Sequence, residues 1–451
     1  KTKKSVTKSK SISEKKSSIK GSPKEKIMSI LKVIGHGKEE LFEDIKFSRN
    51  EKSFTIYNLF IGNCTIEKIE VEDLNKLYLE GIFEGIVNNQ ATNYFNSYNG
   101  KFFDEIKFSG IEKCDLGDEL TVDAAKEIVL TNLDFKKFDI IKKLINSNID
   151  EHTKNLISFM MSMSWDDFYA KDLQIYDQRD SSEVKYDYFE MSDFKELSIN
   201  KLLINNTSIV SALDTISIKK VLIEKLILDQ AEILSFLNSD AQGSSSFSSK
   251  DYSSYLQNGL KSLRNFEIND ISMSNVKNKR KFLDINSIQL NNVKFDYLGD
   301  KGNKKIPISF EFNIDEVDYN YKSDPYGVPT ISDLKSAADT LNYDTIKFKF
   351  GGKWDWNTRR NNLSINLDLG ASDAISLKLK SSFVDLSTDF LNLTGAPLAT
   401  YFMTQPKLKS LDISLNDNSL KNRLIESYAE SENMTSEQTK DFVVQSLDIF
   451  I

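Results

Sequence analysis

Few side chains in this sequence have the types and spacing that catalysis requires. His36 and His152 are the only histidines. A metal site built from several histidines is therefore excluded, and Ser-His-Asp or Cys-His catalysis would have to use one of these two residues. His36 lies in Gly35-His36-Gly37-Lys38, which lacks the spacing of a phosphate-binding loop and the Ser or Thr that follows its Lys. We expect His36 in an exposed turn and His152 at the start of a helix, neither with a catalytic role.

Two acidic segments are the best candidates for catalysis by carboxylates. Asp166 and Asp167 follow Trp165 directly, and a second cluster runs from Asp115 to Glu119. Paired carboxylates can hydrolyse glycosides or hold a metal ion if they converge in a cleft. Neither segment has the alternating ligands, the Gly and the terminal Glu of a calcium loop. A hydrolase is the least favoured hypothesis, and we expect a protein that is not an enzyme, with no catalytic, metal-binding or cofactor-binding residues.

The aromatic segment Trp354-Asp355-Trp356-Asn357 admits two interpretations. It could offer a surface on which sugars stack, but it stands between the strand-like residues Phe350 and Leu363. The simpler interpretation is the turn of a β-hairpin, with large residues at the margin of a sheet.

The composition favours β-sheet as the framework of the molecule. The chain has 451 residues, of which 39% are hydrophobic, with 29 Phe and 17 Tyr. It can bury a substantial core, and its aromatic and β-branched residues are typical of strands. Only 18 Gly and 6 Pro are present. Most turns must therefore rely on Asn, Asp and Ser, whose side chains bond to nearby backbone and tolerate positive φ.

Apolar and polar residues alternate in many segments. Apolar side chains occupy every second position over residues 363–369, 375–379 and 411–415. The same alternation begins near Phe42 and continues through residues 45–47, 54–56 and 66–71. This pattern predicts an antiparallel sheet with one dry face and one wet face.

Helical spacing interrupts the strands at intervals. It predicts a helix from Ile27 to Ile34 and another that Ser332 caps and that ends at Leu341. A terminal helical pair is predicted at 419–428 and 436–447, since Thr435 and Gln438 have the spacing of a capping box. Further helices are predicted around Phe138, Ile141 and Leu144, around Leu156, Phe159, Met160 and Met163, and over 223–237 and 252–263, with a Ser-rich loop at 244–249.

Two sequence echoes indicate repeated strand pairs. Phe42-Glu-Asp-Ile-Lys-Phe-Ser48 returns as Phe103-Asp-Glu-Ile-Lys-Phe-Ser109, with only Glu and Asp exchanged. Short apolar runs also close repeatedly on an Asn before further apolar residues. These asparagines are Asn58, Asn132, Asn206, Asn275 and Asn292. Both echoes suggest one structural unit used more than once.

Charge is distributed unevenly along the chain. The first 26 residues contain ten Lys against Glu14 and Glu25, which gives them a charge of +8. Because the net charge of the chain is −8, the remaining residues carry a charge of −16. An acidic body argues against a reader of duplex nucleic acid. The favoured interpretation of residues 1–26 is a disordered basic linker, and its lysines could also lie close to anionic lipid head groups.

The cysteines and the hydropathy leave the compartment open. Cys64 and Cys114 are the only cysteines, and a disulfide and two unpaired thiols are both compatible with the sequence. No run of apolar residues is long enough for a transmembrane helix. The chain begins at Lys1, so a removed signal peptide and an omitted membrane anchor are both compatible with it.

The predicted dry face is the strongest physical signal. An extended apolar face must meet a second sheet, helices, a partner or lipid. Closure of the sheet on itself is the default interpretation, and a groove that carries acyl chains is the sharper alternative. We predict that this face is lined by Phe310, Phe312, Phe348, Phe350, Leu367 and Leu377.

A longer pattern occupies the last third of the chain. It consists of Leu341-Asn-Tyr-Asp344, Ile346-Lys-Phe-Lys-Phe350, Trp354-Asp355, the strand pair at 363–369 and 375–379, Leu411-Asp-Ile-Ser-Leu415, Asp417-Asn-Ser-Leu420 and Met434-Thr-Ser-Glu-Gln438. This pattern resembles the end of exported AsmA-like repeat proteins of alphaproteobacterial envelopes. The resemblance implies a long, bent antiparallel sheet in the periplasm, with a role in envelope assembly or in lipid movement between membranes. It carries over no active-site residues.

We therefore predict a mainly β protein with interspersed helices, built on a long curved antiparallel sheet of the repeat type with an AsmA-like groove and a C-terminal helical pair. The predicted organisation is a basic linker (1–26), a first β-rich repeat block (27–134), a mixed block (135–265), an antiparallel β block (266–418) and the helical pair (419–451).

The predicted function is that of a periplasmic envelope protein, either a scaffold for envelope assembly or a groove that shields or transfers lipid. A segment absent from this chain would anchor it to the inner membrane. The expected partners are lipid or envelope proteins, without nucleic acid and without a cofactor. The alternative is a surface or scaffold protein that binds other proteins through sheet edges or helices.

Overall fold

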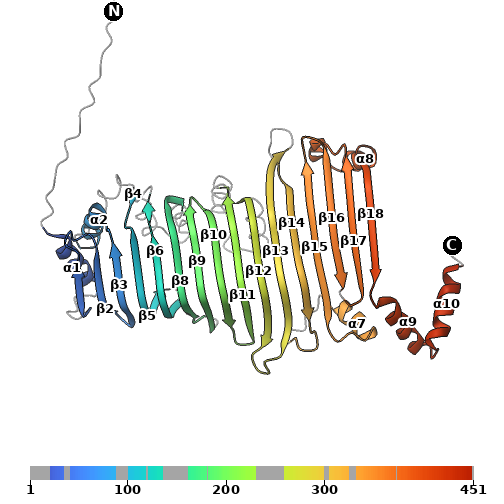
Figure 1. Ribbon diagram of the computed structural model, residues 1–451, viewed down its shortest axis with the longest axis horizontal. Coiled ribbons are helices and arrows are strands. Elements are labelled where there is room, and N and C mark those ends of the chain that lie inside the picture. Colours follow the sequence, from blue (N-terminus) through green and yellow to red (C-terminus); the bar gives the residue numbers. More distant parts are fainter. Residues whose placement is uncertain are drawn as a thin grey trace, which may run out of the picture.

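The computed structural model describes residues 21–34, 41–87, 100–117, 120–135, 161–179, 181–229, 259–298, 304–324, 332–371 and 373–448. Its main feature is one long open antiparallel sheet of 18 strands (Figure 1). The strands follow one another along the long axis of the molecule nearly in chain order, so the N-terminal and C-terminal segments lie at opposite ends. The predicted mainly β fold with a long antiparallel sheet is confirmed.

The strands lengthen toward the middle of the sheet. The first part contains β1 (Asp44–Phe47), β2 (Phe54–Ile61), β3 (Cys64–Glu72), β5 (Glu105–Gly117) and β6 (Leu120–Thr131), with the short strands β4 (Gly100–Lys101) and β7 (Asp134–Phe135). The middle contains β8 (Met163–Asp177), β9 (Ser182–Lys195), β10 (Ser198–Val210), β11 (Asp214–Leu228), β12 (Leu260–Asn275), β13 (Lys281–Leu298) and β14 (Lys304–Tyr319). The last part contains β15 (Ile346–Asn357), β16 (Asn362–Ala371), β17 (Ile375–Val384) and β18 (Lys407–Asp417).

Several predicted helices are confirmed. The helix predicted at Ile27 is α1 (Pro23–Ile34), and the one predicted at Ser332 is α7 (Ser332–Thr340). The terminal pair is α9 (Leu420–Ser431) and α10 (Ser436–Asp448). Before α10, the Thr435 backbone N–H donates to Gln438 Oε1 at 2.9 Å and the Gln438 N–H donates to Thr435 Oγ1 at 3.2 Å. These two bonds are the reciprocal pair of a capping box.

Three helical elements were not predicted. They are α2 (Lys76–Ile86), the 3₁₀ helix η3 (Thr388–Asn392) and α8 (Ala396–Thr404). Asn75 caps α2, because its side-chain oxygen accepts a bond from the Leu77 N–H at 3.0 Å.

Other predicted helices are replaced by strands in part. Residues 223–228 end β11, so that part of the predicted helix is wrong. Met161, Ser162 and Gly259 are helical as predicted, but Met163 begins β8 and residues 260–263 begin β12. Trp354 and Trp356 likewise lie within β15, and the turn that follows is at 358–361. The remaining residues of these predicted helices, the Ser-rich loop, His36 and His152 lie outside the described residues.

Left-handed residues interrupt the strands along two lines that cross the sheet. The first kink line has such a residue on every second strand, with φ between 40° and 59°, at Asn58, Gly110, Asp172, Asn206, Asp270 and Glu316. The second kink line has φ between 48° and 55° at Asp193, Lys225 and Asn292 within the intervening strands, and at Asp73 and Asn132 directly after the ends of β3 and β6. Opposite each left-handed residue of the first line, the neighbouring strands have a residue that is skipped in the register and has no partner in that ladder. Lys219, for example, lies opposite Asn206 between the pairs Asn205↔Lys220 and Thr207↔Ile218.

The kink lines change the spacing of apolar residues. In an extended strand, side chains on one face lie two positions apart. Where a strand crosses a kink line, one extra residue is inserted, so two apolar side chains on the same face lie three positions apart. Between the two kink lines the spacing is again two. In β11 this series is Ile218, Val221, Ile223 and Leu226. Such spacing imitates the spacing of a helix, which explains why the sequence predicts a helix from residue 223 although residues 223–228 belong to β11.

Polar side chains tie neighbouring strands along both kink lines. On the first line, Asn206 Nδ2 donates to Asp187 at 2.8 Å, Lys219 pairs with Asp270 at 3.0 Å, and Asn286 donates to Glu316 at 2.9 Å. On the second line, Asn132 donates to Asp166 at 2.6 Å and Asn200 donates to Asp193 at 3.0 Å. At Gly110 an added Cβ would lie 2.6 Å from the Cβ of Glu67, so only Gly fits there. The polar residues of the kinks thus reinforce the wet face.

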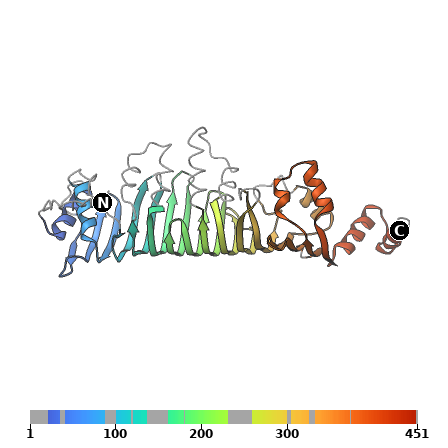
Figure 2. The ribbon, with the colours of Figure 1, turned by 90° about the horizontal axis from the view of Figure 1, so that it is seen from above.

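Among the described residues, helices cover the dry face only at its two ends. At the N-terminal end, Ile27 and Ile30 of α1 and Tyr78 and Leu79 of α2 form one buried cluster with the first strands. At the other end, Tyr401 of α8 and the segment around η3 bury Trp356 and Leu363. Figure 2 shows α2 and α8 on the same side of the sheet, with α9 and α10 extending past its end.

Candidate apolar binding face

Two rows of apolar side chains run without interruption across the sheet between the kink lines. Each step is a direct cross-strand pair, and paired residues of an antiparallel ladder share a face. Row A consists of Phe47, Phe54, Val71, Ile106, Leu130, Phe168, Met191, Leu202, Ile223, Phe266, Leu290, Phe312, Gly352, Leu367, Leu379 and Ile413. Row B consists of Ile45, Ile56, Ile69, Phe108, Ile128, Ala170, Phe189, Ile204, Val221, Ile268, Ile288, Ile314, Phe350, Leu369, Leu377 and Leu415. We call this two-row stripe the apolar track.

The six residues predicted to line the dry face lie on one face of β14 to β17. Phe312 and Leu367 belong to row A, and Phe350 and Leu377 belong to row B. Phe310 pairs with Trp354 just outside row A, and Phe348 pairs with Val317 just outside row B. The structure therefore brings these residues together, although it does not test whether they bind a ligand.

Close ring contacts set the surface of the track near β14 and β15. The ring centroids of Phe312 and Phe350 lie 4.7 Å apart, and those of Phe310 and Trp354 lie 6.3 Å apart in a stacked arrangement. Row A has a glycine at position 352, where an added Cβ would lie 2.9 Å from both Phe312 Cε1 and Leu367 Cδ2. The missing side chain makes room for the Phe312 ring.

Burial of the track decreases from the N-terminal to the C-terminal end. Under α1 and α2, Ile56 is only 3% exposed. Most track residues of β8 to β14 are half-buried, whereas Phe350 is 40% exposed and Leu415 is 62% exposed. A large apolar surface is therefore accessible toward β18, which is unusual for a soluble monomer.

The opposite face of the sheet carries ion pairs in place of apolar rows. Lys201 contacts Glu190 at 2.9 Å and Lys220 contacts Glu267 at 3.0 Å across neighbouring strands. Glu127 accepts from both Lys107 and Lys171, the latter at 2.6 Å, and these two bonds lower the pKa of Glu127 to about 2. The sheet is thus strongly amphipathic, with charge on one side and hydrocarbon on the other.

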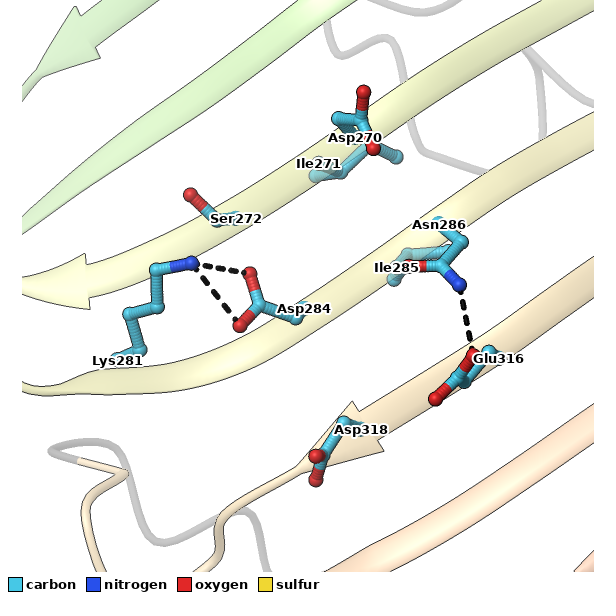
Figure 3. Close-up of a pocket in the computed structure, with 9 residues that line it drawn as sticks. All are labelled: Asp270, Ile271, Ser272, Lys281, Asp284, Ile285, Asn286, Glu316 and Asp318. Atoms are coloured by element: carbon cyan, nitrogen blue, oxygen red, sulfur yellow. Dashed lines mark hydrogen bonds and ion pairs between the residues drawn. The ribbon is translucent and has the colours of Figure 1, made fainter. Parts of the chain in front are cut away.

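A polar depression of about 390 Å³ lies on the wet face of β12, β13 and β14 (Figure 3). It contains four carboxylates, and each has a partner. Lys281 contacts Asp284 at 3.0 Å and Asn286 donates to Glu316 at 2.9 Å. Asp270 pairs with Lys219 at 3.0 Å and Asp318 with Lys347 at 3.8 Å. Of the four carboxylates only Asp270 and Asp284 contact a lysine at 3.0 Å, since Asn286 is a neutral partner for Glu316 and Asp318 Oδ1 is buried without a hydrogen-bond partner.

A smaller apolar pocket of about 210 Å³ lies between α7 and the ends of β15, β16 and β17. Ala338 and Leu341 line it from the helical side, and Ile346, Ala371 and Ile375 line it from the strands. Ala371 pairs with Phe348, which lies just outside row B. The pocket is therefore next to the edge of the apolar track.

The other sequence candidates do not assemble a site where the structure describes them. Asp166 and Asp167 are exposed residues of β8, and partial desolvation of the Asp167 carboxyl together with the charge of nearby Glu190 raises the pKa of Asp167. Trp356 is 3% exposed and donates its indole N–H to the Leu386 carbonyl at 3.3 Å, so it packs a core instead of offering a surface for sugars. Within the described ranges, no group of three or more metal-binding side chains is close enough to hold an ion.

Cys64 and Cys114 form a disulfide between β3 and β5, with their Cα atoms 4.1 Å apart. Cys114 belongs to a buried cluster with Ile111, Val122 and Ala125, against which Cys64 packs. The sequence left a disulfide and free thiols open, and the structure selects the disulfide.

Comparisons with known proteins add little to this geometry. A family model described only as an uncharacterized protein matches residues 368–451, from β16 to the C-terminus. Neither a curated protein nor a solved structure matches the chain. No helix among the described residues is long and apolar enough to cross a membrane.

Proposed function

We propose that this protein is a non-enzymatic envelope protein whose apolar track shields the acyl chains of lipids, as a lipid-transfer surface or as a lipid-bound scaffold. The observation that carries the proposal is the unbroken apolar track from β1 to β18, half-buried in the middle and exposed toward β18. Acyl chains need a continuous hydrocarbon surface and few specific polar contacts, so a track without catalytic groups suits them.

The asymmetry of the sheet supports this proposal. Ion pairs on the wet face keep that side in water, while the track on the other side offers hydrocarbon. A sheet that only closed on itself would need a second layer along its whole length. Among the described residues, helices supply such a layer only near the first strands and near β15 to β17.

The disulfide supports the cellular location in this proposal. Disulfides persist mainly in oxidising compartments such as the bacterial periplasm. The Cys64–Cys114 bond therefore favours a place outside the cytosol. Resemblance of residues 341–438 to AsmA-like envelope proteins points in the same direction.

Site-specific photo-crosslinking tests the proposal. The photoreactive residue p-benzoylphenylalanine replaces Phe189 of the track in one variant and Tyr188 in the control, since these neighbours point to opposite faces of β9. After expression in a bacterial envelope and irradiation, we expect phospholipid adducts by mass spectrometry at position 189 and at least tenfold fewer at position 188.

Two results would contradict the proposal. One is equal labelling at both positions, which would reflect contact with bulk membrane. The other is the absence of lipid adducts at 189 together with native mass spectra of the purified chain that contain no bound lipid. Melting temperatures of both variants close to that of the unmodified chain ensure that the comparison concerns folded protein.

A further inference from the structure

Among the described residues, the last strand of the sheet leaves an edge without a partner strand, although it has a bulge at Lys409 and charges at both its ends and at Asp412. All residues of β18 are exposed, and Leu411, Ile413 and Leu415 are 52%, 57% and 62% exposed. Within the described part of the chain, β18 pairs only with β17. Natural proteins protect long edges with charges, prolines or covering elements, because such edges readily add another strand. The apolar side chains of β18 have no charged residue between them on their face.

The opposite edge of the sheet is different. β1 has only four residues, Asp44–Phe47. Helix α1 lies beside it, since Lys24 Nζ lies 5.8 Å from the Phe47 ring centroid and Ile27 and Ile30 pack in the same cluster as Ile45. Only one end of the sheet is therefore built to be extended.

The sequence of β18 is complementary to itself in one antiparallel register. If Ile413 lies opposite Ile413 of a second copy, then Leu411 lies opposite Leu415 and Asp412 opposite Ser414. Lys409 lies in a β-bulge between Leu408 and Ser410, at the level of Asp417 of the second copy. Moving the centre to Asp412 would place that carboxylate opposite its own copy and leave Lys409 opposite Leu415. A shift of the register by one residue would turn the apolar side chains to the wet face.

We propose that two copies of this chain pair through β18 in that register and form a twofold dimer with one continuous sheet. A twofold axis perpendicular to the sheet keeps both dry faces on the same side, so row A of one copy continues into row A of the other at Ile413. The interface is isologous and closes after two copies. Because β1 has only four residues, the far ends of the dimer offer little edge for growth into a filament.

The terminal helices are placed to contribute to the same interface. Helices α9 and α10 extend past β18 instead of folding back onto the sheet (Figures 1 and 2). Tyr428 and Phe442 stack with ring centroids 6.2 Å apart, yet they are 40% and 50% exposed. This inference does not depend on lipid binding, because it concerns the edge of the sheet and not its dry face.

Disulfide trapping tests the register. In an Ile413→Cys variant of the full chain, the new thiols of the two copies lie opposite each other, whereas in the control Ser414→Cys they do not. We expect mild oxidation to convert most of the Ile413→Cys protein to a covalent dimer and to leave Ser414→Cys mainly uncrosslinked. Light scattering of the unmodified chain should give twice the mass of 51.5 kDa.

Charge exchange provides the second measurement. Lys409→Asp and Asp417→Lys should each weaken the dimer about tenfold, since each removes two symmetric ion pairs, and the double variant should restore it. A chain that stays monomeric at about 100 µM would overturn the proposal, as would equal crosslinking of the two cysteine variants. Crosslinking of Ile413→Cys to a foreign protein in cells, without the homodimer, would assign the edge to another partner and would overturn it as well.

Discussion

At the scale of single residues, the left-handed asparagines determine the shape of the sheet. Asn291 and Asn292 are neighbours in β13, but only Asn292 has positive φ, at 55°. Non-Gly residues other than Asn and Asp pay about 1–2 kcal/mol for this conformation. We expect Asn292→Val to lower the free energy of unfolding by about 1–2 kcal/mol and Asn291→Val to change it much less. Urea denaturation of both variants measures the difference.

Replacing Asn292 by glycine separates two possible roles of this residue, its left-handed backbone conformation and the bonds of its side chain. Asn292→Gly keeps the left-handed conformation accessible, so it should retain most of the stability that Asn292→Val loses. Equal losses in the Gly and Val variants would show that the Asn292 side chain, and not its φ angle, stabilises the kink.

Glu127 is the residue whose charge should matter most for stability. Its side chain is 16% exposed between Lys107 and Lys171, and these lysines lower its pKa from 4.5 to about 2. A pKa that is lower in the folded state means that the ionised form stabilises the fold. This contribution is complete above about pH 4.5 and is lost as the pH falls through about 2.

We therefore expect Glu127→Gln to lower the free energy of unfolding by about 1 kcal/mol at pH 7, with a difference from the unmodified chain that shrinks as the pH falls from 4.5 toward 2. Asp284→Asn is the control, because its ion pair with Lys281 is exposed. Denaturation at several pH values measures both variants, and a difference independent of pH would rule out the ion pairs as its cause.

The sequence revealed the recurrent asparagines but not the backbone conformation that they adopt. The recurrent asparagines at 58, 132, 206 and 292 were noticed as the ends of apolar runs. The structure places each of them in a left-handed kink, whereas Asn275 ends β12 and accepts a bond from the Lys277 N–H at 2.9 Å. Asn tolerates the left-handed region in turns and in kinks alike, so its presence alone does not separate the two.

At the scale of elements, prediction succeeded where strands are regular. β16 and β17 have no kink, and their period-two alternation was predicted correctly. In β11 the kink at Lys225 gives the apolar residues a helical spacing, and the prediction was wrong. The candidate face was therefore predicted only from β14 to β17. The earlier strands could have been included by searching for apolar residues spaced three, two and three positions apart, with two polar residues in each gap of three.

The disulfide should stabilise only the elements that it joins. It closes a loop between residues separated by 50 positions and links β3 to β5, which also pair directly. In the chain-entropy model such a bond contributes at most about 4 kcal/mol. We expect the Cys64→Ser/Cys114→Ser double variant to lose amide hydrogen-exchange protection in β2, β3 and β5, with β16 and β17 unchanged as the internal control. Equal loss in both regions would contradict a local role.

At the scale of the whole molecule, each strand of the long sheet contacts mainly its two neighbouring strands, and the described residues form no single compact core. The buried clusters are separate, one under α1 and α2, one around the disulfide, one at Phe194 and Leu197 and one under α8. What connects these clusters is the apolar track, because each of its residues pairs directly with the next strand.

A single charge in the middle of the track should separate its two halves. Ile204 of β10 lies in row B, and its neighbour Asn205 lies on the wet face opposite Lys220. Ile204→Asp places a carboxylate where acyl chains would pass, and an ion in a hydrocarbon surface is strongly unfavourable. Asn205→Asp adds the same charge beside a lysine on the other face. Measured as transfer of a fluorescent phospholipid between vesicles, Ile204→Asp should reduce the rate at least tenfold while Asn205→Asp leaves it nearly unchanged.

The same pair of variants separates transport from local binding. If lipid moves along the track, photo-crosslinking at Phe108 and at Phe350, several strands away from Ile204 on either side, should still detect bound lipid in the Ile204→Asp variant, because each half keeps its own apolar surface. If lipid serves only as a structural ligand, the variant should lose the adducts at Phe189, beside the new charge, without any change in transfer between vesicles. A rate that falls equally in both variants would count against the track, because the two substitutions share only the added charge.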